Sequence, residues 1–296
     1  MKKHLILALT TGLSLSACSP SDQSVLTEQT SPSVVDYQAK GIISKSLPEI
    51  VEALNNGEIS SEALVTLYLD RIEAIDKQGP RLQAVLNVNP DALILAKELD
   101  VMRANGVIKG PLHGVPILLK DNIETLDNMP TTAGALALKD NITHRDSPLV
   151  AGLRAQGAII LGKTNLSQWA NFRSEGSMSG WSALGGQVRN PHMLDRNPCG
   201  SSSGSGAATA ASLAAGTVGT ETNGSIICPS NANGIVGFKP TVGIVPQQHI
   251  IPISESQDTA GPMTKSVNGA AMLMNAMATT TPDLDYTSGL NANALT

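Results

Sequence analysis

The sequence predicts an α/β fold with a sheet covered by helices. Two apolar runs, "VPILLKD" (Val115 to Asp121) and "AIILGKT" (Ala158 to Thr164), have the length and composition of buried strands. A helix is predicted between them from Asp146-Ser147-Pro148, and the order strand, helix, strand favours a parallel sheet. Aromatic residues make up only 2% of the 296 residues. Small and aliphatic side chains must therefore fill the core, which suits closely packed layers.

Three helices are predicted before the first strand. Ser46-Leu47-Pro48-Glu49 is a capping box with a proline in the first turn, and this helix should end near Asn55-Asn56-Gly57. Apolar residues then recur at helical spacing from Leu64 to Ile75. A third helix should follow Asn89-Pro90 and end at Gly106.

A glycine- and serine-rich segment, Gly200 to Gly206, leads directly into Ala207 to Ala215, a run of small helix formers. Its composition alone would suit a flexible linker. A linker should separate domains, however, and this one precedes a helix whose small side chains suit close packing. We therefore expect a buried loop whose hydroxyls and N–H groups favour anionic chemistry.

The N-terminal residues resemble an export signal. Lys2 and Lys3 precede an apolar run from Leu5 to Leu15, which is too short to span a bilayer. The sequence that follows resembles a lipobox, with Cys18 as the lipidated residue, although a conventional cleavage site is the alternative. The expected organisation is a signal peptide (1–18), a solvated tether (19–40) and one domain (41–296). This predicts an exported lipoprotein held at the membrane, facing the periplasm or the cell exterior.

Composition argues against several classes of partner. The formal net charge is −5 without a lysine or arginine cluster, so nucleic acid is not an expected partner. The five histidines are scattered without ligand spacing and there is no paired-cysteine motif, so no metal site is expected. Cys199 and Cys228 are the cysteines of the expected domain. The sequence leaves open whether they form a disulfide or lie buried as free thiols.

Two local motifs suggest other chemistry but fail in context, and a third motif is absent. "GAIILGKT" (Gly157 to Thr164) matches a phosphate-binding loop, but its apolar middle predicts a strand where a loop is needed. Gly200 to Gly204 matches the G-x-S-x-G elbow with Ser202 as nucleophile, but His249 is the only histidine that follows. No S-x-x-K spacing accompanies the serine-rich segments. These motifs therefore do not identify the site.

Three sequence blocks together resemble the amidase signature family. They are "GPLHGVPILLKDNIETLDNMPTTAGALAL" (110–138), the serine-rich loop, and "GTETNGSIICPSNANGIVGFKPTVGIVP" (219–246), in the family's order and spacing. The resemblance runs from about Ser46 to about Met277 and looks closest to bacterial peptide amidases, which hydrolyse C-terminal carboxamides. It implies a central mixed sheet with helices on both faces. It also implies hydrolysis of a carboxamide C–N bond without a cofactor, in a small amide or peptide-amide substrate.

The resemblance places a Ser-cisSer-Lys triad on named residues. The lysine is Lys120, the bridging serine is Ser201 and the nucleophile is Ser225. Lysine can act as a base only when neutral, and burial beside Ile117, Leu118 and Leu119 is expected to lower its pKa. Ser202 is an expected supporting residue. The implied oxyanion donors are the backbone N–H groups of Thr222, Asn223, Gly224 and Ser225.

The sequence also departs from the family pattern. Asn223 stands where many relatives have glycine, and Ile227 where many have arginine, which we interpret as marks of the peptide-amidase branch. Relatives continue well past the matching region, so we expect this chain to be truncated at its C-terminus. The alternatives are a non-catalytic relative or an inactive fragment, and an amidotransferase subunit, which should lack an export signal.

Overall fold

The computed structural model describes residues 41–279 and residue 286. The predicted signal peptide (1–18) and tether (19–40), Cys18 included, lie outside the described residues. None of the helices formed by the described residues is both long enough and apolar enough to cross a membrane.

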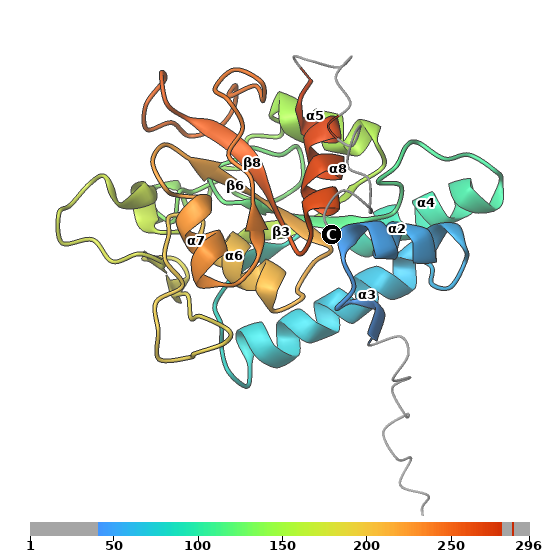
Figure 1. The fold of residues 1–296 in the computed structure, drawn as a ribbon, viewed down its shortest axis with the longest axis horizontal. Helices are drawn as coiled ribbons and strands as arrows, with labels where there is room; N and C mark the ends of the chain where they lie inside the picture. Colours follow the sequence, from blue (N-terminus) through green and yellow to red (C-terminus); the bar gives the residue numbers. More distant parts are fainter. Residues whose placement is uncertain (1–40, 280–285, 287–296) are drawn as a thin grey trace, which may run out of the picture. The chain divides into compact units, whose positions relative to one another are not determined.

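Helices and strands are interspersed along the chain (Figure 1). The α-helices are α2 (Leu47–Asn55), α3 (Ser61–Arg71), α4 (Ala92–Ala104), α5 (Pro148–Ala155), α6 (Ser203–Ala210), α7 (Ile227–Ala232) and α8 (Val267–Met277). The strands are β1 (Val85–Val88), β2 (Pro116–Lys120), β3 (Ile159–Thr164), β4 (Trp181–Ser182), β5 (Gly186–Gln187), β6 (Gly216–Glu221), β7 (Val236–Gly237) and β8 (Thr259–Thr264). Short helices of other types are η1 (Ile72–Lys77), η2 (Leu136–Leu138) and η3 (Gln168–Asn171).

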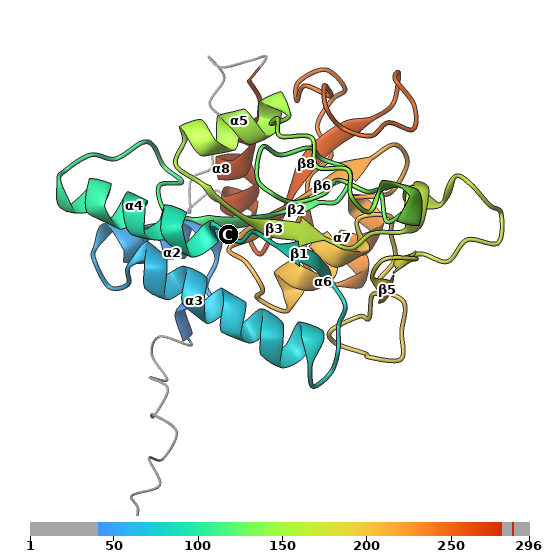
Figure 2. The same cartoon turned by 180° about the vertical axis from the view of Figure 1, so that it is seen from behind.

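Six strands form one mixed sheet in the order β1-β3-β2-β6-β8-β7. The part of this order from β1 to β8 can be followed in Figure 2. The strand β2 pairs in parallel with both β3 and β6, whereas β1, β8 and β7 join through antiparallel pairs. The predicted parallel pairing of the two apolar runs is confirmed, with Lys120 opposite Thr164. The carboxyl ends of β2, β3 and β6 therefore meet at one edge of the sheet, where α/β proteins commonly bind ligands.

Helices cover both faces of this sheet, as predicted. Neighbouring residues of β6 face opposite sides, because side chains alternate along a strand. The hydroxyl of Thr217 lies 3.0 Å from that of Thr209 in α6, whereas a side chain at Gly216 would contact Leu273 in α8. Both ribbon views accordingly place α6 on one side of the sheet and α5 and α8 on the other (Figures 1 and 2).

The predicted N-terminal helices are confirmed. The carboxylate of Glu49 accepts a hydrogen bond from the backbone N–H of Ser46 at 2.7 Å, completing the capping box of α2. The second predicted helix is α3, continued by the π-helical turn η1. The third corresponds to α4.

The helix expected over Ala207 to Ala215 lies earlier in the chain than predicted. It begins at Ser203 and ends at Ala210, so the last four residues of the serine-rich segment are helical. A side chain at Gly204 would come within 2.3 Å of the Ala84 carbonyl oxygen. Only glycine therefore fits at this position of the helix. At the other end, the N–H of Ala215 donates to the carbonyl of Pro116 (3.1 Å), which draws the chain into the sheet.

Candidate active site

Lys120 and Ser201 form the centre of the candidate site. Lys120 is the last residue of β2, and Ser201 lies just before α6, which packs on that part of the sheet. The Nζ atom of Lys120 lies 2.7 Å from the Oγ atom of Ser201. Both residues are buried, with exposed fractions of 0% and 1%. The fold therefore brings together two of the three predicted triad residues in hydrogen-bonding contact.

The remaining contacts of Lys120 come from the end of β6. Its Nζ atom lies 3.2 Å from the carbonyl oxygen of Thr220 and 2.9 Å from the Thr220 hydroxyl. The amide of Asn122 also donates to that hydroxyl, at 3.0 Å. A neutral amine has two N–H groups and one lone pair. Thr220 can accept both N–H groups, so the lone pair is left to accept the Ser201 proton.

Burial changes the protonation of this lysine. Loss of hydration lowers the pKa of Lys120 from 10.5 to about 7, against the opposing effect of the negative charges of Asp258 and Glu221. A substantial fraction of Lys120 is therefore neutral near neutral pH. This is the form that a general base requires.

Ser201 is held in place by its backbone. The peptide bond between Gly200 and Ser201 is cis, as the resemblance implied. The carbonyl of Ser201 accepts a hydrogen bond from the N–H of Ser167 at 3.0 Å. A side chain at Gly200 would lie only 2.3 Å from the Ser167 hydroxyl, so glycine permits the close approach of these two loops.

Ser202 supports the lysine indirectly. Its hydroxyl donates to the carbonyl of Thr220 (3.0 Å) and accepts from the N–H of Thr220 (3.2 Å). Its own N–H donates to the carbonyl of Ser225 (3.2 Å). Ser202 thus ties together the strand end that surrounds Lys120 and the turn that carries Ser225.

Ser225 lies in the turn between β6 and α7. It has an exposed fraction of 9%, which makes it the most accessible of the three predicted triad residues. The hydroxyl of Ser225 makes no hydrogen bond to Ser201 or to any other described residue. The structure therefore links Ser225 to the Lys120–Ser201 pair through the backbone of Ser202. Catalytic hydrogen bonds commonly tighten only when substrate is bound.

The expected oxyanion turn is divided between two roles. The N–H of Gly224 donates to the carboxylate of Glu221 at 2.8 Å, so in this arrangement it does not face a substrate. The N–H groups of Thr222, Asn223 and Ser225 have no acceptor among the residues that the structure describes. The expectation for an oxyanion site therefore narrows to these three donors.

A second buried lysine anchors the strand ends beside the site. Lys163 of β3 lies 3.5 Å from a carboxylate oxygen of Asp121 and 2.9 Å from the Thr131 hydroxyl. Asp121 also accepts a hydrogen bond from the Thr132 hydroxyl. Burial raises the pKa of Asp121 and lowers that of Lys163. Asp121 directly follows Lys120, so this pair holds the end of β2 against β3.

The two cysteines that the sequence left open form a disulfide. Cys199 and Cys228 have Cα atoms 5.9 Å apart. Cys199 lies two residues before Ser201, and Cys228 three residues after Ser225. The N–H of Cys228 also donates to the carbonyl of Gly224 (2.8 Å). The disulfide therefore joins the segments that carry the two catalytic serine candidates.

The motifs set aside in the sequence lie in other environments. The segment that resembles a phosphate-binding loop is strand β3, as predicted. The Nδ1 atom of His249 lies 3.8 Å from the carboxylate of Glu124, whereas the Ser202 hydroxyl bonds to Thr220. The described residues include no group of three or more histidine, cysteine or acidic side chains that could hold a metal ion.

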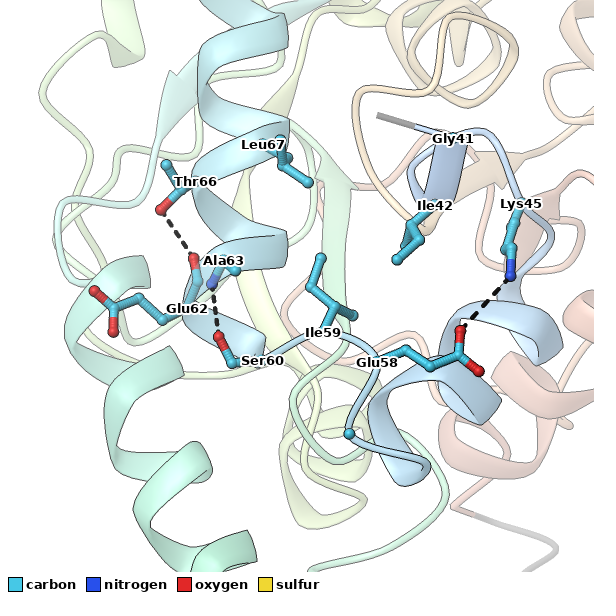
Figure 3. A pocket seen from close by; sticks show the side chains of 11 residues that line it. Gly41, Ile42, Lys45, Glu58, Ile59, Ser60, Glu62, Ala63, Thr66 and Leu67 are labelled. Atoms are coloured by element: carbon cyan, nitrogen blue, oxygen red, sulfur yellow. Dashed lines mark hydrogen bonds and ion pairs between the residues drawn. The ribbon is translucent and has the colours of Figure 1, made fainter. Parts of the chain in front are cut away.

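Two cavities lie away from the triad residues. One, of about 1230 Å³, lies between the segment from Gly41 to Lys45 and the start of α3 (Figure 3). Ile42 and Ile59 extend into it from its two sides, and an ion pair between Lys45 and Glu58 lies at its edge (Figure 3). The other, of about 350 Å³, is lined by residues of the segment 168–181. Neither cavity is lined by Lys120, Ser201 or Ser225.

Fold and site together define an α/β protein with a buried serine–lysine pair at the carboxyl ends of parallel strands. The sequence model of the family described as Amidase matches residues 63–294. The chain therefore belongs to the amidase family, and the resemblance noted in the sequence is confirmed.

Solved structures agree with this assignment. The native peptide amidase from Stenotrophomonas maltophilia is 51% identical, with a TM-score of 0.78 over 84% of this chain and 50% of that one. An amidase family protein from Bacillus anthracis is 39% identical, with a TM-score of 0.82 over 87% of this chain and 54% of that one. The resemblance to peptide amidases is thus confirmed as well.

Curated relatives also match over most of this chain. A glutamyl-tRNA(Gln) amidotransferase subunit from Bdellovibrio bacteriovorus is 40% identical over 233 residues, which are 79% of this chain and 46% of that protein. A relative from Arthroderma benhamiae is 45% identical over 79% of this chain and 39% of its own length. The chain thus spans less than half of these two curated relatives.

Proposed function

We propose that this chain carries the catalytic centre of an amidase that hydrolyses a carboxamide C–N bond and releases ammonia. The observation that carries the proposal is the fully buried Lys120 amine, 2.7 Å from the Ser201 hydroxyl and with a pKa lowered to about 7. Among the described residues Lys120 has no ion-pair partner, and a buried lysine in such a place is costly to maintain for stability alone. Its chemistry as a neutral base accounts for its position.

In the proposed reaction the Oγ atom of Ser225 attacks the amide carbon. Ser201 takes the proton of Ser225 as it gives its own proton to the Lys120 amine. The carbonyl oxygen becomes an oxyanion, and free N–H groups of the turn from Thr222 to Ser225 stabilise it. As the C–N bond breaks, Ser201 donates a proton to the leaving nitrogen and regains one from Lys120. Ammonia leaves and an ester remains on Ser225.

Water completes the cycle by the same proton path. A water molecule attacks the ester carbon and gives one proton towards Lys120 through Ser201. Collapse of the second tetrahedral intermediate returns a proton to the Oγ atom of Ser225. The products are the carboxylic acid and ammonia, and the amine and both hydroxyls return to their starting states, so no cofactor is required.

The proposed substrate is a peptide amide or a similar small carboxamide. Support comes from the likeness to the Stenotrophomonas maltophilia peptide amidase and to a peptide amidase solved with the competitive inhibitor chymostatin. A non-catalytic relative or inactive fragment is the competing possibility, because the chain spans about half of those enzymes. An amidotransferase subunit is the less favoured alternative.

A fluorophosphonate probe tests the proposal on the chain as it stands. We expect one phosphonyl group on Ser225 by peptide mass spectrometry, and none in Ser225→Ala. Ammonia release from a C-terminal peptide amide should disappear in the same variant. Lys120→Ala should label at least about 100-fold more slowly, in keeping with the usual contribution of a general base. Wild-type protein that is folded but unlabelled would identify a binding or inactive chain.

We also propose that the protein is exported and anchored to the membrane by a lipid on Cys18. The support is the basic start, the short apolar run and the lipobox-like sequence before Cys18. A catalytic domain attached through residues 19–40 would then act on amides outside the cytoplasm.

A further inference from the structure

Glu221 is a buried carboxylate that the proposed proton transfers do not use. It is the last residue of β6 and has an exposed fraction of 5%. Among the described residues no lysine, arginine or histidine forms an ion pair with it. An ionised carboxylate in such a place requires other hydrogen-bond donors.

Those donors are backbone N–H groups of the turn that carries Ser225. One carboxylate oxygen accepts from the N–H of Gly224 at 2.8 Å. The other accepts from the N–H groups of Ile226 at 2.7 Å and Ile227 at 2.9 Å. Hydrogen bonds to an ionised acceptor are shorter and stronger than those between neutral groups. Glu221 therefore holds the backbone on both sides of Ser225.

This pattern sorts the N–H groups of the turn into two sets. Gly224, Ile226 and Ile227 direct theirs towards Glu221. No described residue accepts the N–H groups of Thr222 and Asn223, which precede Gly224, or that of Ser225, which lies between Gly224 and Ile226. Gly224 has a φ of +78°, a left-handed conformation that favours glycine and lets successive N–H groups point in different directions.

We propose that Glu221 is a positioning residue that fixes the nucleophile turn, so that the free N–H groups face the substrate carbonyl oxygen next to the Ser225 hydroxyl. This inference rests on the proposed amidase function. Glu221 need not touch the substrate, because it acts through the backbone on either side of Ser225. Glu221, which is not a member of the triad, would thus determine the geometry of the oxyanion site.

The main test compares Glu221→Gln with the wild type in fluorophosphonate labelling of Ser225. Glutamine keeps the length of the side chain but replaces one accepting oxygen with an NH₂ donor, which cannot receive the backbone N–H groups. We expect labelling at the high-pH plateau to slow by up to about 100- to 1000-fold, the range seen when an oxyanion donor is lost. Glu221→Asp keeps both oxygens and should recover part of that loss.

Asp76→Asn is the matched control. Asp76 is a buried carboxylate that accepts the backbone N–H groups of Ala84 (2.6 Å) and Val85 (3.3 Å) at the start of β1, and it also forms an ion pair with Lys77 (3.3 Å). Its loss should reduce thermal stability but leave labelling within about twofold of wild type, because no backbone bond to the nucleophile turn changes. If Asp76→Asn and Glu221→Gln slow labelling equally, positioning by Glu221 is refuted.

Two readouts separate this inference from general destabilisation. The negative charge of Glu221 raises the pKa of Lys120, so the acid limb of labelling should move to lower pH in Glu221→Gln and stay in place in Asp76→Asn. Amide hydrogen exchange at Ile226 and Ile227 should accelerate selectively in Glu221→Gln. Unchanged exchange there would overturn the inference even if labelling slowed.

The exchange measurement also keeps the two proposals distinguishable. If wild-type protein does not label on Ser225, the proposed function fails, whereas protection at Ile226 and Ile227 still reports on Glu221. If Glu221→Gln does not fold, Glu221→Asp carries the comparison. Its shorter side chain should weaken protection at these amides and slow labelling, and wild-type values for both would refute the inference.

Discussion

The pH dependence of Ser225 acylation is the most direct test of Lys120 as the base. Only the neutral amine can accept a proton through Ser201, so the rate should follow the neutral fraction of Lys120. Burial lowers the pKa of Lys120 to about 7, while the charges of Asp258 and Glu221 partly oppose this effect. The acylation rate should therefore rise with pH and approach a plateau above about pH 8.

The size of the effect follows from the change in pKa. A lysine with its ordinary pKa of 10.5 would be neutral in about one molecule in 1000 at pH 7.5, whereas a pKa of about 7 makes about three quarters of the molecules neutral. The environment thus increases the reactive fraction by nearly 1000-fold. The corresponding cost of placing the charged amine in this site is about 5 kcal/mol, at about 1.4 kcal/mol per pKa unit.

The assay is the rate of fluorophosphonate labelling of Ser225 between pH 5 and about pH 10. The probe does not titrate in this range, so the midpoint reports on the protein. An ordinary histidine also titrates near pH 6.5, and His249→Ala is therefore the essential control. We expect this variant to keep both the rate and the midpoint, because His249 lies against Glu124.

Two results would refute the assignment of Lys120. One is a midpoint near pH 10, which would mean that the amine is not desolvated in solution. The other is a His249→Ala variant that loses activity while Lys120→Ala retains it. That outcome would instead support Ser202, in the G-x-S-x-G elbow, as the nucleophile.

Three other properties of the chain can be tested by substitution. Lys120→Met should abolish labelling. It should also raise the free energy of unfolding at pH 7 by up to about 5 kcal/mol, because the buried amine is removed. The Ser201 hydroxyl then loses its partner, which reduces this gain by roughly 1–3 kcal/mol. Between about pH 7 and 10.5 the lysine of the unfolded wild type binds more protons than that of the folded wild type, so wild-type stability should rise with pH. The difference in free energy of unfolding between Lys120→Met and the wild type, measured in urea titrations, should therefore shrink as pH rises. Replacing Cys199 and Cys228 by serine opens a loop with a sequence separation of 29 and should lower the free energy of unfolding by roughly 3.5 kcal/mol in denaturant titrations; unchanged stability would contradict the pairing. Cys18→Ser should move the protein from the membrane fraction to the soluble fraction on cell fractionation, and wild-type protein that is already soluble and lipid-free would contradict the anchor.

Local features were predictable from the sequence because they depend on neighbouring residues. The capping box at Ser46 and Glu49, the apolar run ending at Lys120 and the strand ending at Thr164 all act within a few positions. The resemblance to the amidase family added what local patterns lacked, since by itself a lysine at a strand end or a serine in a turn is an ordinary surface residue. Sequence comparison thereby selected Lys120, Ser201 and Ser225 as candidates.

The sequence by itself determined the three N-terminal helices, the two strands that end at Lys120 and Thr164 and the helix between them. Through the family resemblance it also indicated which side chains could carry the chemistry. Tertiary structure decided how these side chains meet. Lys120 contacts Ser201 and Thr220, which are 81 and 100 positions away, because β6 pairs beside β2 and α6 packs on both. The same packing determines three further features. Glu221 accepts hydrogen bonds from the nucleophile turn, Cys199 pairs with Cys228, and α6 begins earlier than predicted. Contacts between residues distant in sequence arise only after strand order and backbone approach are established, and no local periodicity encodes them.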